Sequence, residues 1–130
     1  WAGLGEVPLP DGVMRLEAVS HAELFPHCAA IVHHGGAGTT TTASRAGVPQ
    51  LVVPHVADQF YWGHRVHALG VAAPMLPRPE LCADTLFERL AGLIGNELVS
   101  ENAAALGRRL RDDYSRAATP ERLLDPFERR

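Results

Sequence analysis

The 130-residue sequence has few cysteines and no long apolar run, and each shortage argues against a class of protein. Cys28 and Cys82 lack the spacing of a metal knuckle or a redox pair, so we expect two buried thiols in a reducing compartment. A run of about 18 apolar residues is absent, and we expect no transmembrane segment. No signal peptide is visible either, which favours a cytoplasmic location.

Neither sign of charge is in large excess. The net charge is −3 with both signs interspersed, which disfavours a nucleic-acid or anionic-membrane binder, because these need a concentrated basic face. The one basic cluster, residues 108–111, lies in a helical stretch and is typical of a solvated face. His64 and His67 share a helical face but have no acidic partner, and no Asp-x-Asp pattern occurs. We therefore expect neither a metal nor another cofactor.

The length and composition fit a single globular domain. Apolar residues make up 46% of the chain and charged residues 21%, both ordinary values. We assign residues 1–118 to the domain. Residues 119–130 carry prolines and mixed charge, and we expect them to form a tail with little packing.

Strand patterns alternate with helix patterns along the domain. This order predicts an α/β fold with parallel strands, in which ligands bind beyond the carboxyl ends of the strands. Ser20 is suited to begin a short helix that stops near Pro26, and Gly47 and Gly70 are suited to end helices. The predicted strands are residues 13–19, 29–33, 50–53 and 71–73; the apolar runs at 29–33 and 50–53 are typical of buried strands, the first of them buried on both faces. The predicted helices are residues 39–46 and 58–69, one that begins at Asp84 or Thr85 and carries Leu86, Leu90, Leu93 and Ile94 on one face, and one that begins at Ser100.

A glycine-rich turn, HHGGAGTT over residues 33–40, joins the strand ending at His33 to the helix that follows it. Gly35, Gly36 and Gly38 would let backbone N–H groups approach an anion, and the helix start adds unpaired donors and partial positive charge. Thr39, Thr40 and His34 can donate further hydrogen bonds. The plainer alternative is a tight turn whose glycines serve packing. We expect His33 itself to be a hydrogen-bonded packing residue.

Several segments together resemble the donor-binding motif of GT-B glycosyltransferases. They are HHGGAGTT, then RAGVPQLVVPHVADQFYWGHRV, then ALG, with AELFPHCAAIVHH and WAGLG upstream. The likeness is to bacterial natural-product glycosyltransferases and sterol glucosyltransferases, and it runs from Trp1 to about Gly95. It implies an incomplete Rossmann-like parallel sheet, the C-terminal half of a GT-B fold, in which the first two strands of the domain are missing.

The resemblance also implies roles for particular residues. His34, Gly36, Gly38, Thr39 and Thr40 match positions that hold the donor diphosphate. Asp58 and Gln59 match a pair that binds hydroxyls of the donor sugar, although Asp58 alone would pass for a helix N-cap. Val19, Ser20 and His21 match a loop near the nucleoside.

The implied reaction is the inverting, metal-independent transfer of a hexose from a UDP- or dTDP-sugar to a small-molecule acceptor. In such enzymes the acceptor and the catalytic base belong to an N-terminal domain, which this sequence lacks, so no catalytic residue is assigned here and we expect the chain alone to be inactive. One alternative is a non-catalytic nucleotide-sugar-binding subunit or remnant that needs a partner chain. A sugar-nucleotide epimerase of similar fold is a weaker alternative, because no acid/base set is evident.

Overall fold

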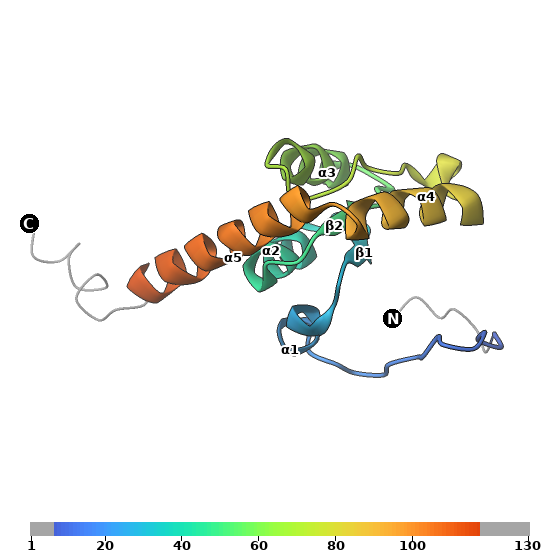
Figure 1. The fold of residues 1–130 in the computed structure, drawn as a ribbon, viewed down its shortest axis with the longest axis horizontal. Helices are drawn as coiled ribbons and strands as arrows, with labels where there is room; N and C mark the ends of the chain where they lie inside the picture. Colours follow the sequence, from blue (N-terminus) through green and yellow to red (C-terminus); the bar gives the residue numbers. More distant parts are fainter. Residues whose placement is uncertain (1–6, 118–130) are drawn as a thin grey trace, which may run out of the picture.

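Short strands and helices alternate along residues 7–117, the part of the chain that the computed structural model describes (Figure 1). In chain order the elements are α1 (His21–Leu24), the 3-10 turn η1 (Phe25–His27), β1 (Ile31–His33), α2 (Ala37–Ala46), β2 (Gln50–Val52), α3 (Asp58–Ala68), the 3-10 turn η2 (Arg78–Glu80), α4 (Ala83–Ile94) and α5 (Glu97–Ala117). The predicted tail, residues 119–130, lies outside this range.

The two strands form a parallel sheet, as predicted for an α/β fold. Ile31 pairs with Gln50 and His33 with Val52, so both strands end at the same edge. The predicted strand at residues 71–73 is reduced to an isolated bridge between Ala72 and Gln50. Parallel strands need a crossover, and α2 supplies it between β1 and β2.

The core forms on both faces of β2. On one face Val52 packs with Val66 of α3 and Ala103 of α5. On the other face Leu51 packs with Leu93 of α4. Successive side chains of a strand point to opposite faces, so β2 is buried on both, as its apolar run predicts.

β1 is buried on one face only. Ile31 packs with Phe25 and Ala43, but Val32 is 45% exposed. Val32 is in register with Leu51 and therefore lies on the face that α4 covers over β2. Burial of β1 on both faces was predicted and is wrong, because the cover of α4 stops at β2.

The strand predicted at residues 13–19 is wrong as well. This segment has no strand or helix, and Val13 is 53% and Met14 77% exposed. Figure 1 shows it (blue) running apart from the sheet before it reaches α1. Its alternating pattern favours a strand, but no described strand lies beside it to accept its hydrogen bonds.

Several helix ends differ from their predicted positions. The N-cap of α3 is Ala57, with a φ of 51°, whereas Asp58, the N-cap candidate in the sequence, is the first helical residue. α5 begins at Glu97, because the side-chain oxygen of Asn96 accepts the N–H of Val99 over 3.2 Å and caps the helix before Ser100. Ile94 is 55% exposed, whereas Leu93, predicted on the same face of its helix, is buried.

The predicted C-terminal glycine of α2 is confirmed. Gly47 has a φ of 74°, the left-handed conformation that such a position requires. Within residues 7–117, no helix combines the length and the apolar character that crossing a membrane would take.

Candidate functional site

The glycine turn joins the end of β1 to the start of α2. Gly35 has a φ of +90°, and its N–H donates to Nδ1 of His33 over 3.0 Å. A β-carbon at Gly35 would lie 2.7 Å from Cγ1 of Val52 and 2.9 Å from the carbonyl oxygen of Gln59. Only glycine fits this conformation and this close approach. The packing role considered for the glycines therefore holds for Gly35.

The turn leads directly into the open N-terminus of α2. The first helical hydrogen bond runs from Thr40 N–H to the carbonyl of Gly36 over 2.9 Å. The N–H groups of Ala37, Gly38 and Thr39 precede this bond and carry the positive end of the helix dipole. A β-carbon at Gly38 would meet nothing within 4 Å. An anion can therefore approach these amides without a side chain in the way.

The imidazole of His34 lies beside the same helix start. A β-carbon on Gly36 would come within 2.5 Å of Nε2 of His34, so the ring covers the position that a side chain would otherwise fill. The residue is exposed to solvent. An exposed imidazole next to unpaired amides is placed to donate to the same anion.

A chain of side-chain hydrogen bonds connects the glycine turn to the buried part of the sheet. Nδ1 of His33 accepts from Gly35, so the ring proton lies on Nε2, which donates to Oε1 of Gln50 over 2.8 Å. The amide of Gln50, which is fully buried, donates in turn to Oγ of Ser44 over 3.0 Å. The prediction that His33 is a hydrogen-bonded packing residue is confirmed.

The pKa of His33 lies below its ordinary value. Burial lowers it by penalising the charged form, and the hydrogen bond to Gln50 opposes this shift. Charges on His34 and His21 lower it further. The neutral imidazole is thus favoured, and only the neutral form can accept the N–H of Gly35.

Asp58 and Gln59 begin α3 next to the glycine turn. The close approach of Gly35 to the backbone of Gln59 brings these two segments to one edge of the sheet. Oε1 of Gln59 accepts the N–H groups of His55 (2.7 Å) and Val56 (3.0 Å) and so fixes the loop before the helix. The carboxylate of Asp58 is exposed at the helix start.

The two threonines predicted to hold the diphosphate differ in exposure. Thr39 is half-buried, in the first turn of α2. Thr40 is only 2% exposed, and its Oγ1 is buried without a hydrogen-bond partner. A buried hydroxyl without a partner is uncommon and costs free energy, which makes Thr40 a residue to test.

The segment predicted near the nucleoside leads into α1, which packs against α2. Val19 is 41% exposed, and Ser20 is the N-cap residue of α1, although its side chain makes no capping bond. His21 stacks on Phe25 with the ring centroids 4.7 Å apart.

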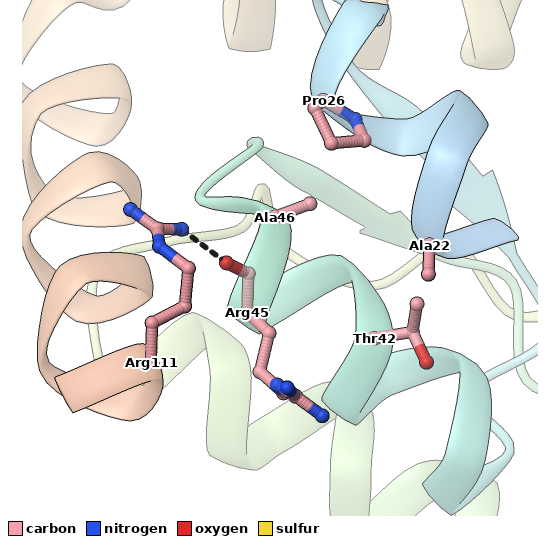
Figure 2. Close-up of a pocket in the computed structure, with 6 residues that line it drawn as sticks. All are labelled: Ala22, Pro26, Thr42, Arg45, Ala46 and Arg111. Carbon is pink, nitrogen blue, oxygen red and sulfur yellow. Dashed lines mark hydrogen bonds between the residues drawn. The ribbon is translucent and has the colours of Figure 1, made fainter. Parts of the chain in front are cut away.

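A pocket of about 480 Å³ lies at the other end of α2, between α1 and α5 (Figure 2). Its arginines are used structurally. Arg111 donates to the carbonyl of Arg45, and the guanidinium of Arg45 lies 4.3 Å from the ring centroid of Tyr114. These contacts cap the C-terminus of α2 and fasten it to α5. None of the predicted site residues lines this pocket.

Sequence reasoning missed Gln50, and it misjudged the burial of both cysteines. A glutamine that opens the otherwise apolar run before Pro54 is a signal for a buried hydrogen-bonding role. Both cysteines are free thiols, but Cys82 is exposed and Cys28 is only half-buried, so the expectation of two buried thiols is wrong. In the range from Val7 to Ala117, no cluster of three or more metal-ligating side chains is found.

Comparison with solved structures finds glycosyltransferases of the GT-B fold. The structure of VinC in complex with dTDP has a TM-score of 0.73 at 39% identity over 80% of this chain and 26% of that one. The spinosyn forosaminyltransferase SpnP has a TM-score of 0.81 at 27% identity over 96% of this chain and 32% of that one. The α/β fold predicted from the sequence and its GT-B resemblance are therefore confirmed.

Comparison with curated sequences finds enzymes of the two predicted kinds. A sterol 3-beta-glucosyltransferase of Arabidopsis thaliana is 40% identical over 87% of this chain and 18% of its own length. The L-demethylnoviosyl transferase of Streptomyces niveus is 44% identical over 86% of this chain and 28% of its own length. The chain thus spans less than a third of either relative. The model of the erythromycin biosynthesis protein CIII-like C-terminal domain matches residues 3–127, and this chain belongs to that family.

Proposed function

We propose that this chain is the donor-binding part of a glycosyltransferase and holds the diphosphate of a UDP- or dTDP-sugar at the start of α2. The observation that carries this proposal is the open helix N-terminus at Gly38 with the exposed imidazole of His34 beside it. VinC and the rhamnosyltransferase SpnG, both similar in structure, have each been solved with dTDP (thymidine diphosphate). Family membership over residues 3–127 supports the same assignment.

The proposed diphosphate site uses His34, Gly36, Gly38, Thr39 and Thr40. Gly36 and Gly38 keep side chains away from the helix start, and the amides there bind phosphate oxygens. Thr39 donates from its hydroxyl. Thr40 has a buried hydroxyl that lacks a partner, and a phosphate oxygen is the acceptor that we propose for it.

The proposed sugar site is formed by Asp58 and Gln59. The carboxylate of Asp58 is exposed and can accept from two adjacent sugar hydroxyls. Gln59 already uses its side-chain oxygen to hold the loop at His55 and Val56, so it offers its NH₂ group to the sugar as a donor. Val19, Ser20 and His21 are the proposed neighbours of the nucleoside.

This arrangement suits the departure of a nucleoside diphosphate. Negative charge develops on the leaving oxygen as the bond to the anomeric carbon breaks, and fixed amide dipoles with His34 stabilise it without reorganisation. These groups supply charge stabilisation themselves, which is why we propose a metal-independent transfer. That the transfer is an inverting displacement of a hexose is what the family resemblance implies, and we propose it on that ground. Another domain of the whole protein would bind the small-molecule acceptor and supply the base that activates it.

The experiment is calorimetric titration of the chain with dTDP, UDP and their glucose conjugates. The proposal predicts saturable binding of at least one diphosphate, strengthened by the sugar through Asp58 and Gln59. Absence of binding to all of them would refute it. The same preparation, incubated with donor and generic acceptors, is expected to give no turnover. Robust turnover would show that this chain carries a catalytic base after all.

The cellular setting fits the same proposal. Cys28 and Cys82 are both free, as thiols are in a reducing compartment, and we propose the cytoplasm as the site of action.

A further inference from the structure

The buried imidazole of His33 has no role in the diphosphate site proposed above, yet it is bonded directly to the turn that forms that site. Nδ1 accepts the N–H of Gly35 over 3.0 Å, two residues further along the chain. The other ring nitrogen is held by Oε1 of Gln50, which is fully buried, at 2.8 Å. The ring is therefore fixed at both nitrogens, with the proton on Nε2.

This bond withdraws one amide of the turn from a ligand. Because the N–H of Gly35 is used internally, it is not offered to an anion, and the amides of Ala37, Gly38 and Thr39, which precede the first helical hydrogen bond, are the ones left for it. The same turn orients Gly36, over which the ring of His34 lies. A change at Nδ1 of His33 would therefore affect the conformation of the whole proposed diphosphate site.

We propose that His33 is a positioning residue for the diphosphate, which it orders by locking the N–H of Gly35 with the lone pair of Nδ1. This inference rests on the proposed function and adds a residue that does not touch the ligand. The groups that face His33 with titratable charge are His34 at the turn and His21 of α1. Gln50 and Ser44, which complete the chain of bonds, are neutral.

The roles of the two ring nitrogens of His33 can be tested separately by substitution. In His33→Asn the side-chain oxygen occupies the place of Nδ1 and can accept from the residue two positions on, the geometry of an Asx-turn. In His33→Gln the amide nitrogen occupies the place of Nε2 and keeps the bond to Gln50 but offers nothing to Gly35. Asparagine therefore keeps the hydrogen bond to Gly35 and loses the one to Gln50, and glutamine does the reverse.

The test measures dTDP affinity by calorimetry and thermal unfolding for wild type and both variants. We expect His33→Asn to bind dTDP within about twofold of wild type but to unfold at a lower temperature, because it leaves Oε1 of Gln50 buried without a partner. We expect His33→Gln to bind dTDP about tenfold more weakly, because it loses the hydrogen bond that orders Gly35, although it keeps the bond to Gln50. A residue that served stability alone would not give this crossed pattern.

Each result decides something. If wild type fails to bind dTDP, the proposed function fails and this inference falls with it. If wild type binds and the two variants have equal affinities, or the order is reversed, only the inference is overturned. A further measurement needs no variant: nitrogen NMR of wild type should show Nδ1 of His33 unprotonated at neutral pH, and a protonated Nδ1 would overturn the lock even if a variant fails to fold.

Discussion

Gly35 and Gln59 touch through their backbones, closely enough that a β-carbon on the glycine would lie 2.9 Å from the carbonyl oxygen of Gln59. The two residues belong to the turn after β1 and the first turn of α3. Their contact brings the proposed phosphate site and the proposed sugar site to one edge of a parallel sheet. A nucleotide sugar needs this adjacency, because its diphosphate and its sugar are directly bonded.

Gly35→Ala should destabilise the fold. The added methyl would collide with Val52 and with the backbone of Gln59, and it would force a side chain into a φ of +90°. We expect a loss of about 2–3 kcal/mol in the free energy of unfolding, measured by denaturant titration. A loss below about 0.5 kcal/mol would show that the two segments are not packed together as described.

Gly38→Ala should separate binding from stability. A β-carbon there meets nothing within 4 Å, and alanine is a better helix former than glycine, so stability should rise by up to about 1 kcal/mol. The methyl would project into the space proposed for the diphosphate, and calorimetry should show weaker dTDP binding. Undiminished affinity would place the ligand elsewhere.

Thr40→Val tests the buried hydroxyl that has no partner. Removing an unsatisfied polar group should stabilise the chain by about 1 kcal/mol in thermal unfolding. If this hydroxyl donates to the diphosphate, the same change should weaken dTDP binding several-fold. Thr41→Val is the matched control, because Oγ1 of Thr41 already donates to the carbonyl of Ala37 over 2.8 Å. Unchanged dTDP affinity in Thr40→Val would remove Thr40 from the site.

Stability should depend on the protonation of His33. Its folded-state pKa is lowered, chiefly by burial, so below the ordinary histidine value of about 6.5 the unfolded chain takes up this proton more readily. The contribution is therefore complete above about pH 6.5 and is lost as the pH falls toward the folded-state pKa, with a slope of at most about 1.4 kcal/mol per pH unit. Denaturant titrations at several pH values should show a shallower slope in His33→Asn. Equal slopes would contradict the neutral, buried imidazole.

Local patterns predicted the part of the fold that is held by neighbours in sequence. The glycine turn, the αL glycine at position 47 and the buried run from Gln50 to Val53 follow from backbone freedom and apolar character. Residues 13–19 have an equally good strand pattern, but a strand depends on a partner that the pattern does not contain. The start of α5 was misplaced because Asn96 and Ser100 are both good caps, and only the folded chain shows which one is used.

The proposed site likewise has parts that the sequence predicted and parts that depend on distant residues. The spacing of His34, Gly36 and Gly38 predicted a loop that binds an anion, and the family resemblance added Asp58 and Gln59; both stay predictions. The link between His33 and Gln50 was not predictable, because it joins residues 17 positions apart through a strand register that the sequence does not state. Likewise, the engagement of the Gln59 oxygen by the loop before α3 depends on the backbone path, including the positive φ of Ala57.

The most direct test of the account is to follow the backbone amides of the chain by NMR while dTDP is added, in wild type and in His34→Ala. The account predicts that the largest shifts fall on Ala37, Gly38 and Thr39, and that His34→Ala weakens binding by about tenfold or more, whereas His64→Ala, another exposed histidine, leaves it unchanged. Shifts centred on the pocket between α1 and α5, or equal affinity in His34→Ala, would contradict it.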